Sequence, residues 1–423
     1  MRGVNEPGEP RPFTVEGLAV DSLRRRRHDR RPVPRSQVVE NPKGSSARAA
    51  VLPALAARPY SASDRLFVCA LLFAAAAINL GLIWDMSWDM SFGRDSFWSP
   101  PHVMVNAGGA LAAAAALAWV VFATRRGDPR SVRVGRVRVP LGAALALWGS
   151  GAMLAAGGLE IAWSRAYGMA VGAWTPPQVL FVCAMAALMG GVVLVAGSRR
   201  AEGPWLALPC AAGLALTFAG VALAPYTLPN LQHGRTFFLL TSAVFPLLLA
   251  WSARSDPGRS VALKAAAVYT AAVCAMIWIL PLVPAHALIG PVFEKVDHMV
   301  PPRFPLLLLV PALVFDRMAG ARDPAGRDSW ANAVVLGLVF TAMFVAVQWV
   351  FAGFLLSPAS EGFFFAGGGR HWPFYVDIGE ERRQFWEPDG RLTLVAALLC
   401  VILATLSARV GLALGRFTED LER

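Results

Sequence analysis

Ten apolar stretches, separated by polar connections, make up most of the chain after residue 60. They cover residues 66–84, 102–123, 139–160, 177–196, 204–224, 236–252, 261–282, 299–316, 331–356 and 392–415. Most of them are long enough to cross the hydrocarbon core of a bilayer as a helix, which satisfies its backbone hydrogen bonds internally. The pattern therefore predicts an all-α, polytopic integral membrane protein with about ten transmembrane helices arranged in hairpins.

The eighth stretch differs from the others at its start. Pro301, Pro302, Arg303 and Pro305 crowd its first residues, and proline lacks the backbone donor that a regular helix needs. We therefore expect this span to be short, tilted or partly re-entrant.

The composition agrees with a membrane location. Of the 423 residues 56% are hydrophobic and 16% are charged, whereas soluble proteins carry about 25% charged residues. The formal net charge of +11 would suit nucleic acid binding, but residues 1–65 hold 13 Lys/Arg against 7 Asp/Glu, and much of the remainder lies in short connections. The distribution thus favours the lipid bilayer as the partner and no nucleic acid.

Residues 1–60 are rich in proline and arginine and show no core-forming period. We expect them to form a disordered basic tail, followed by a transmembrane domain over 61–423. A signal peptide is one alternative, with Ala49–Ala57 as its apolar core, although that core is short and contains a proline. Binding of the arginine run at 24–31 to anionic lipid head groups is another.

Basic residues are divided unequally between the two sides of the predicted helices. The even-numbered connections hold 14 Lys/Arg, and the first four odd-numbered connections hold 5. Since basic residues favour cytoplasmic connections, both termini are predicted to be cytoplasmic. The expected location is a plasma (inner) membrane of bacterial type.

Histidines and acids gather on the predicted outer side, where every histidine after the tail falls. The histidines are His102, His233, His286, His298 and His371, and the acids are Asp85, Asp89, Asp95, Glu160, Glu294, Asp297 and Asp377. Imidazole and carboxylate groups together bind divalent transition metals or transfer protons. The outer side is therefore where we expect a site.

The densest group lies between the first two spans, in WDMSWDMSFGRDSFWSPPHVMVN over 84–106. It holds Asp85, Asp89, Asp95 and His102, together with three tryptophans of the kind that favour the edge of a bilayer. One interpretation is a metal or proton site near the outer surface. The alternative is a solvated acidic loop with an interfacial belt of tryptophans, since the spacing matches no fixed metal-binding motif.

A second hairpin resembles the first. Asp85-x-x-Trp88 and Trp98-Ser-Pro-Pro-His102 in the first correspond to Glu160-x-x-Trp163 and Trp174-Thr-Pro-Pro-Gln178 in the second. An even number of spans separates them, so the partial repeat is predicted to be parallel. The Ser/Thr-Pro-Pro part has a structural explanation, because these residues begin helices.

If Ser99 caps a helix, His102 becomes its third residue. The positive end of the helix dipole then favours a neutral imidazole, which is the form that binds metal or accepts a proton. Asn106 lies four residues on and is expected to orient the ring.

Three further groups complete the candidate site. Glu160 follows two glycines at the outer end of the third span and needs a partner, either His102 or Asp85, unless it reaches the interface or pairs with Arg165. His298 lies beside Asp297 in the fourth outer connection. His371 lies in the last one, after a glycine run that suits a mobile lid, or else an aromatic loop on the membrane surface.

The preferred function is a membrane-embedded, metal-dependent oxidoreductase that acts on a lipid-soluble or periplasmic substrate. No hydrolase triad, Walker or Rossmann motif is present. The predicted ligands of a divalent metal ion (copper, iron, zinc or manganese) are Asp85, Asp89, His102, His298 and His371, and the predicted catalytic residues are Glu160 and Asp95. The five cysteines show no CxxC spacing and are interpreted as packing residues.

Two other functions stay open from the sequence. A transporter of ions, protons or a small solute would need polar groups near the midplane, where Asn79 and Gln348 are the nearest examples. A non-catalytic membrane subunit or assembly factor would use the outer connections to bind partner subunits.

Overall fold

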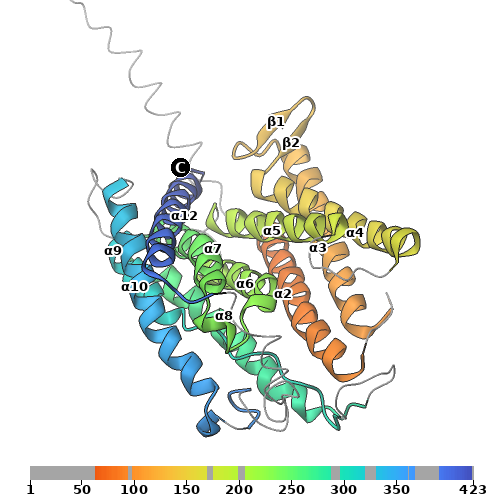
Figure 1. Ribbon diagram of the computed structural model, residues 1–423. Coiled ribbons are helices and arrows are strands. Elements are labelled where there is room, and N and C mark those ends of the chain that lie inside the picture. The colour runs from red at the N-terminus through yellow and green to blue at the C-terminus, as the bar shows by residue number, and fades with distance from the viewer. Residues whose placement is uncertain are drawn as a thin grey trace, which may run out of the picture. The chain divides into compact units, whose positions relative to one another are not determined.

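The computed structural model describes residues 62–93, 98–168, 175–198, 205–286, 296–319, 330–360, 362–366 and 390–421. The chain divides into two units, Met1–Arg58 and Pro59–Arg423, and every described residue belongs to the second (Figure 1). The predicted basic tail over 1–60 lies outside the described residues.

Among the described residues, eight helices are long and apolar enough to cross a membrane. They are α2 (Ala62–Ser91), α3 (Pro100–Arg126), α4 (Leu141–Tyr167), α5 (Pro176–Gly197), α7 (Arg235–Ser255), α8 (Val261–Ile279, continued by η3, Leu280–Leu282), α10 (Trp330–Leu355) and α12 (Leu394–Asp420). The prediction of a helical, multi-pass membrane protein is confirmed. The other two apolar stretches form the shorter helices α6 (Ala207–Ala222) and α9 (Leu309–Ala319), so the total of about ten crossings and the direction of each stay predictions.

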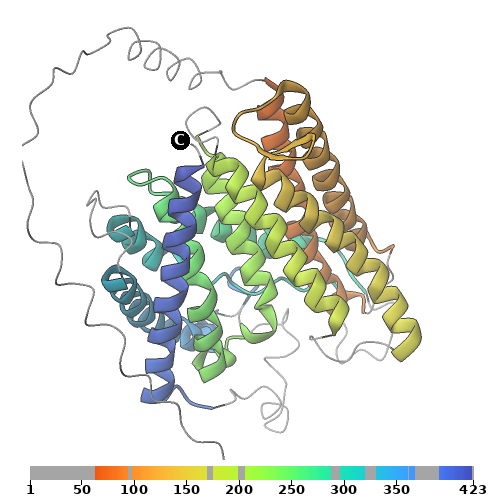
Figure 2. The same ribbon diagram turned by 90° about the horizontal axis from the view of Figure 1, so that it is seen from above.

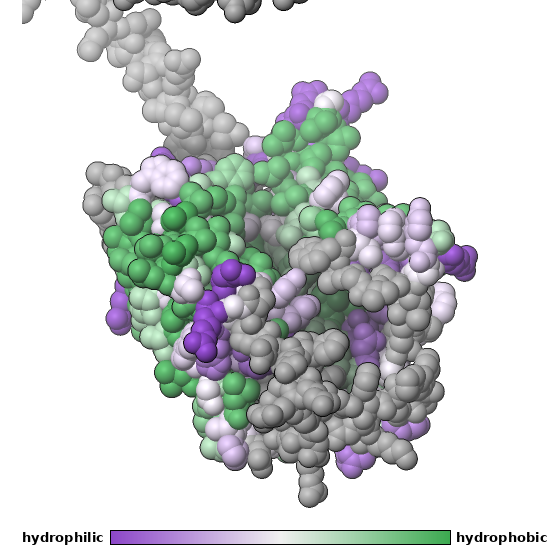
Figure 3. All heavy atoms as spheres, viewed as in Figure 1, coloured by the Kyte–Doolittle hydropathy of each residue, from purple (hydrophilic) through white to green (hydrophobic). Residues whose placement is uncertain are grey.

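The surface of these helices suits lipid. On α12, for example, Leu398, Ile402 and Leu406 are all about half exposed and recur every fourth residue, so they form one apolar stripe. Figure 3 shows broad hydrophobic areas of this kind on the face that it presents. Contiguous apolar surface of this extent is rare on soluble monomers and typical of a lipid-facing wall.

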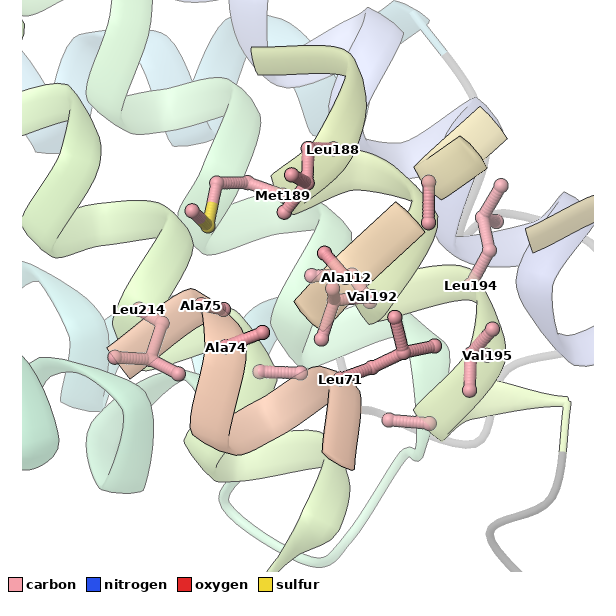
Figure 4. Close-up of a cluster of buried hydrophobic side chains, with 14 of the residues drawn as sticks. Leu71, Ala74, Ala75, Ala112, Leu188, Met189, Val192, Leu194, Val195 and Leu214 are labelled. Carbon is pink, nitrogen blue, oxygen red and sulfur yellow. The ribbon is translucent and has the colours of Figure 1, made fainter. Parts of the chain in front are cut away.

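The first four long helices form two antiparallel hairpins, α2 with α3 and α4 with α5. Small residues permit their close approach: a Cβ atom at Gly149 would lie 2.5 Å from the backbone nitrogen of Leu188, and one at Gly191 would lie 2.5 Å from that of Ala146. Small interfacial residues of this kind drive helix association in lipid, where burial of apolar surface contributes little. The buried cluster drawn in Figure 4 joins residues of α2, α3, α5 and α6, among them Leu71, Ala112 and Leu188.

A second apolar core lies between α7, α8, α9, α10 and α12. Helices α7 and α12 run side by side (Figure 2) and meet at Gly411 and Gly415 of α12. Polar contacts extend this interface: Arg254 of α7 pairs with Glu419 of α12, and Trp251 Nε1 donates to Thr418 Oγ1 at 2.8 Å.

Helix α7 contains Pro246, and a side chain from α12 enters the helix next to this proline. Ser407 Oγ accepts a hydrogen bond from the backbone nitrogen of Leu247 at 2.9 Å and donates one to the carbonyl oxygen of Ala243 at 2.8 Å. In an unbroken helix these two backbone groups would bond each other. The hydroxyl of α12 therefore bridges both ends of this turn of α7.

The eighth apolar stretch is helical only in its second half. Residues 301–308 are non-helical and precede α9, in agreement with the irregular span that its prolines predict. The backbone nitrogen of Leu306 donates to Tyr269 Oη at 2.9 Å, and that of Leu307 donates to Gln348 Oε1 at 2.9 Å. Non-helical backbone is tolerated at membrane depth where protein side chains satisfy it in this way.

Helix α9 also supplies a cap for its neighbour. Asp316 accepts hydrogen bonds from the backbone nitrogens of Ala262 at 3.0 Å and Leu263 at 2.8 Å, in the first turn of α8. The residue that precedes this helix, Ser260, adopts a left-handed conformation with φ 52° and makes no side-chain cap hydrogen bond. A distant aspartate therefore does what an N-cap residue usually does.

We expect Asp316→Ala to lower the free energy of unfolding by about 1–2 kcal/mol, since two helix-terminal N–H groups lose their acceptor. Thermal unfolding of the purified variant in detergent measures this. Asp256→Ala is a suitable control because Asp256 forms an ion pair with the exposed Arg259, at 3.6 Å. We expect its free energy of unfolding to lie within about 0.5 kcal/mol of that of the wild type. Equal losses in the two variants would argue against the capping role.

Two short strands interrupt the otherwise helical fold. β1 (Val132–Val134) and β2 (Val137–Val139) form an antiparallel hairpin in the connection between α3 and α4. The sequence analysis did not anticipate it.

Candidate functional site

The acidic stretch after the first span is helical for longer than expected. Helix α2 continues to Ser91, so Asp85 and Asp89 lie in its last two turns and not in a loop. Aromatic contacts favour this extension, because Trp84 meets Trp88 edge to face and Trp88 meets Phe92 at a tilt, with ring centroids 6.2 Å and 4.3 Å apart. Asp95, the third acid of the stretch, lies outside the described residues.

Helix α3 begins as its Ser-Pro-Pro sequence predicts. Ser99 is the extended residue before the helix, the prolines occupy the first two helical positions, and His102 is the third. The Ser99 hydroxyl makes no cap hydrogen bond, and Pro101 at the second position removes one of the two N–H groups that a cap residue usually binds. His102 therefore lies in the first turn, at the positive end of the helix dipole.

This geometry brings His102 of α3 to Asp85 of α2. His102 Nε2 lies 3.1 Å from Asp85 Oδ1, and the two side chains are 36% and 22% exposed. Within the described part of the chain, Asp85 Oδ1 is buried and has no hydrogen-bond partner, so this close approach lacks the angles of a hydrogen bond. Two of the predicted ligands are thus adjacent.

Two other expectations for this hairpin have different outcomes. We expected Asn106 to orient the imidazole of His102. Its amide nitrogen instead donates to the backbone oxygen of His102 at 2.9 Å and so stabilises the helix. Asp89 is exposed, one turn beyond Asp85.

The second hairpin repeats part of this arrangement. Glu160 lies near the end of α4, and α5 begins with Pro176 and Pro177 after the extended residue Thr175. Ser164 Oγ lies 3.5 Å from Glu160 Oε1. Among the described residues, Glu160 Oε2 and Thr175 Oγ1 are buried without a hydrogen-bond partner, as are Asp85 Oδ1 and Ser99 Oγ in the first hairpin.

His298 also contacts a carboxylate. Its Nδ1 lies 3.0 Å from Asp297 Oδ1, although neighbours in sequence seldom face each other. The backbone is extended here: Met299 N donates to the oxygen of Val283 at 2.9 Å, and Ala285 N donates to that of Asp297 at 3.0 Å. Pairing of the two arms of the connection therefore holds the histidine in place.

The same connection is fixed to the end of α2. Ser87 Oγ donates to the oxygen of Val300, and the nitrogen of Val300 donates to Ser91 Oγ at 2.8 Å. Met299 and Ala285 form a small apolar cluster with Trp84 and Trp88. The structure thus joins the α2–α3 and α8–α9 connections at the end of α2. It does so through two serines whose spacing of four places them on one helix face.

The predicted ligands do not form one compact group within the described ranges. No set of three or more His, Cys, Asp or Glu side chains there is placed to hold a metal ion. Asp85 pairs with His102, and Asp297 pairs with His298, whereas His371 lies outside the described residues. All five cysteines are free thiols: Cys274 and Cys400 are buried, in agreement with a packing role, whereas Cys69 and Cys183 are exposed on the surface of the helices.

Comparisons with protein families, curated proteins and solved structures gave no match. The chemistry of the site is therefore interpreted from its own geometry.

Proposed function

We propose that this membrane protein binds a divalent transition-metal ion at the outer end of the α2/α3 hairpin, with Asp85 and His102 as two of its ligands. The separation of 3.1 Å between His102 Nε2 and Asp85 Oδ1 supports this. Two ligand atoms, each about 2.0–2.1 Å from one metal ion, are about 2.9–3.3 Å apart in octahedral or tetrahedral geometry. A buried carboxylate oxygen that lacks a hydrogen bond, beside an imidazole nitrogen, fits such a ligand pair.

Two protein ligands do not complete a site, so further ligands are part of the proposal. Asp89 on the next turn of α2 and Asp95 in the same connection are the nearest candidates in sequence, and His298 and His371 are the more distant ones. Imidazole with carboxylates suits copper, iron, zinc or manganese. Water in the remaining positions would leave room for a substrate.

The proposed reaction class is oxidation or reduction of a lipid-soluble or extracytoplasmic substrate. Its support is the position of the pair at the ends of two apolar helices, among aromatic side chains that suit the bilayer edge, of which Trp98 is 77% exposed. The bound metal would supply redox or Lewis-acid chemistry. Glu160 and Asp95 are proposed as proton donors or acceptors, and the buried Oε2 of Glu160 is consistent with this role.

Metal analysis of the purified protein tests the proposal. The wild type in detergent is incubated separately with Cu²⁺, Fe²⁺, Zn²⁺ and Mn²⁺, desalted, and its metal content is measured by mass spectrometry. We expect near-stoichiometric binding of at least one ion, and a more than tenfold weaker affinity in Asp85→Asn and His102→Ala.

His233→Ala is the matched control. His233 is a half-buried histidine, also on the predicted outer side, whose Nε2 lies 3.1 Å from the backbone oxygen of Trp349. We expect the metal content of this variant to equal that of the wild type. A wild type without metal, or Asp85 and His102 variants that retain it while still folded, would contradict the proposal.

Transport of an ion or small solute is the second candidate, and one observation favours it. Residues 301–308 and α9 form a discontinuous span, the feature from which many transporters build midplane sites. Gln348 and Gln232 beside it are buried, and Gln348 Nε2 donates to Gln232 Oε1 at 2.7 Å. Substrate uptake by proteoliposomes that is unchanged in Asp85→Asn would favour transport over the metal site.

A further inference from the structure

The β1/β2 hairpin has two chemically different faces. Its register pairs Val132 with Val139, Arg133 with Arg138 and Val134 with Val137. Because successive side chains of a strand point to opposite faces, the four valines share one face and the paired arginines share the other. A helical membrane protein has no need of such a hairpin merely to connect two helices.

The hairpin is fixed to the end of a membrane-spanning helix. Thr124 Oγ1 of α3 accepts a hydrogen bond from the nitrogen of Arg138 at 2.9 Å and lies 3.2 Å from its carbonyl oxygen. Helix α3 ends at Arg126 and α4 begins at Leu141, and both are candidate membrane spans. The strands therefore lie at the boundary where these two helices leave the bilayer.

The valine face is open but continuous with the apolar core. Val132, Val134 and Val137 are 57%, 62% and 41% exposed, whereas Val139 packs against the core cluster of α2–α6. In Figure 3 the region of β1 and β2 is hydrophobic, with hydrophilic side chains at its edges. An isolated two-stranded hairpin is at best marginally stable in water. Contact of the exposed valines with an apolar environment would stabilise it.

The other face of the hairpin and its flanking residues are strongly basic. Six arginines (Arg125, Arg126, Arg130, Arg133, Arg136 and Arg138) lie between residues 125 and 138, with Asp128 as the only acid. Arg133 and Arg138 are directly opposite each other across the strands, and like charges in that position destabilise a sheet. An anionic surface would offset this repulsion.

We propose that the hairpin lies in the head-group layer of the same bilayer that α3 and α4 span, and that it binds anionic phospholipids there. The valines enter the boundary with the acyl chains, and the arginines contact lipid phosphates. In the head-group layer, acyl chains and lipid phosphates lie at adjacent depths. The valine face and the arginine face of the hairpin can therefore both have suitable surroundings there. Each arginine close to an anionic membrane surface strengthens the association about fivefold.

Spin labels on the two faces test the proposal. Val134→Cys and Arg133→Cys are made in full-length protein whose five cysteines are replaced, and each variant is reconstituted in nanodiscs of phosphatidylcholine with phosphatidylglycerol. We expect the label at 134 to collide with oxygen dissolved in lipid and the label at 133 to collide with an aqueous nickel complex. Two water-accessible labels, or two labels shielded from both reagents as under a protein partner, would overturn the proposal.

Trypsin digestion of the unaltered protein provides a second test that needs no cysteine replacement. Cleavage after Arg133 and Arg136 is expected to be slower in nanodiscs with phosphatidylglycerol than in pure phosphatidylcholine. Cleavage after Arg259, whose side chain is 60% exposed in the α7–α8 connection, is the internal reference. Equal relative rates in the two lipids would refute lipid binding by the hairpin. An unchanged lipid preference of cleavage after Arg136, the site that remains in Arg133→Gln/Arg138→Gln, would refute it as well.

Discussion

Gln348→Leu is expected to lower the free energy of unfolding by about 2–6 kcal/mol, because it removes the partners of two buried polar groups. Gln348 is 1% exposed, and its Oε1 accepts from the backbone nitrogen of Leu307 in the non-helical half of the eighth span. Its Nε2 donates to Gln232. Leucine fills a similar volume but offers neither group, so both partners are left in an apolar interior. Denaturation of the purified variant in detergent micelles measures the loss.

Thr341→Val is the matched control for this prediction. Thr341 lies on the same helix, is 6% exposed, and donates to the oxygen of Gly337 one turn earlier at 2.9 Å. Its removal leaves no distant backbone group without a donor, so we expect a change of less than about 1 kcal/mol. If Gln348→Leu were as stable as Thr341→Val, the non-helical segment 301–308 would not depend on Gln348.

Gly411→Ala is expected to push α12 away from α7 and to lower the free energy of unfolding by about 3 kcal/mol. A Cβ atom there would clash with the carbonyl oxygen of Leu247 and would lie 2.9 Å from the Cβ atom of Ala250. Backbone cannot rotate out of the way as a side chain can, so α12 must shift as a whole. The hydrogen bonds of Ser407 and Thr418 to α7 would weaken with it.

Gly151→Ala separates this clash from the general effect of removing a helical glycine. Gly151 lies within α4, and no atom lies within 4 Å of a Cβ atom built there. The alanine variant is expected to be more stable than the wild type by about 0.5–1 kcal/mol. The same denaturation assay, applied to both variants, should therefore give changes of opposite sign. If both variants were less stable than the wild type, crowding at Leu247 would not be the cause of the destabilisation in Gly411→Ala.

The part of the candidate site that depends on local rules could be predicted from the sequence. The Ser-Pro-Pro sequence fixes the start of α3 and so places His102 in its first turn. Hairpin pairing of two apolar spans then brings the end of α2 to the start of α3, where Asp85 meets His102. Apolar length and the distribution of small residues likewise predict the long helices and their hairpins.

Features that depend on distant segments could not be predicted in this way. Ser87 and Ser91 have no local reason to bind Val300, more than two hundred residues away, and Asp316 caps a helix that begins 55 residues earlier. Hydropathy does reveal that the eighth span is irregular, but it does not say which side chains satisfy its backbone. Tyr269 and Gln348 become visible in that role only when the helices are packed.

The serine that enters α7 beside Pro246 has a consequence for biosynthesis. Leu247 and Ser407 are 160 positions apart, so the ribosome releases α7 long before its partner exists. Until α12 is inserted, α7 lacks the hydroxyl that bridges Leu247 N and Ala243 O beside its proline, which weakens this turn in the hydrocarbon and favours retention of the helix by insertion machinery or chaperones. Chains that stop before residue 407 are therefore expected to be short-lived in the cell, even though seven of the eight long helices are already complete.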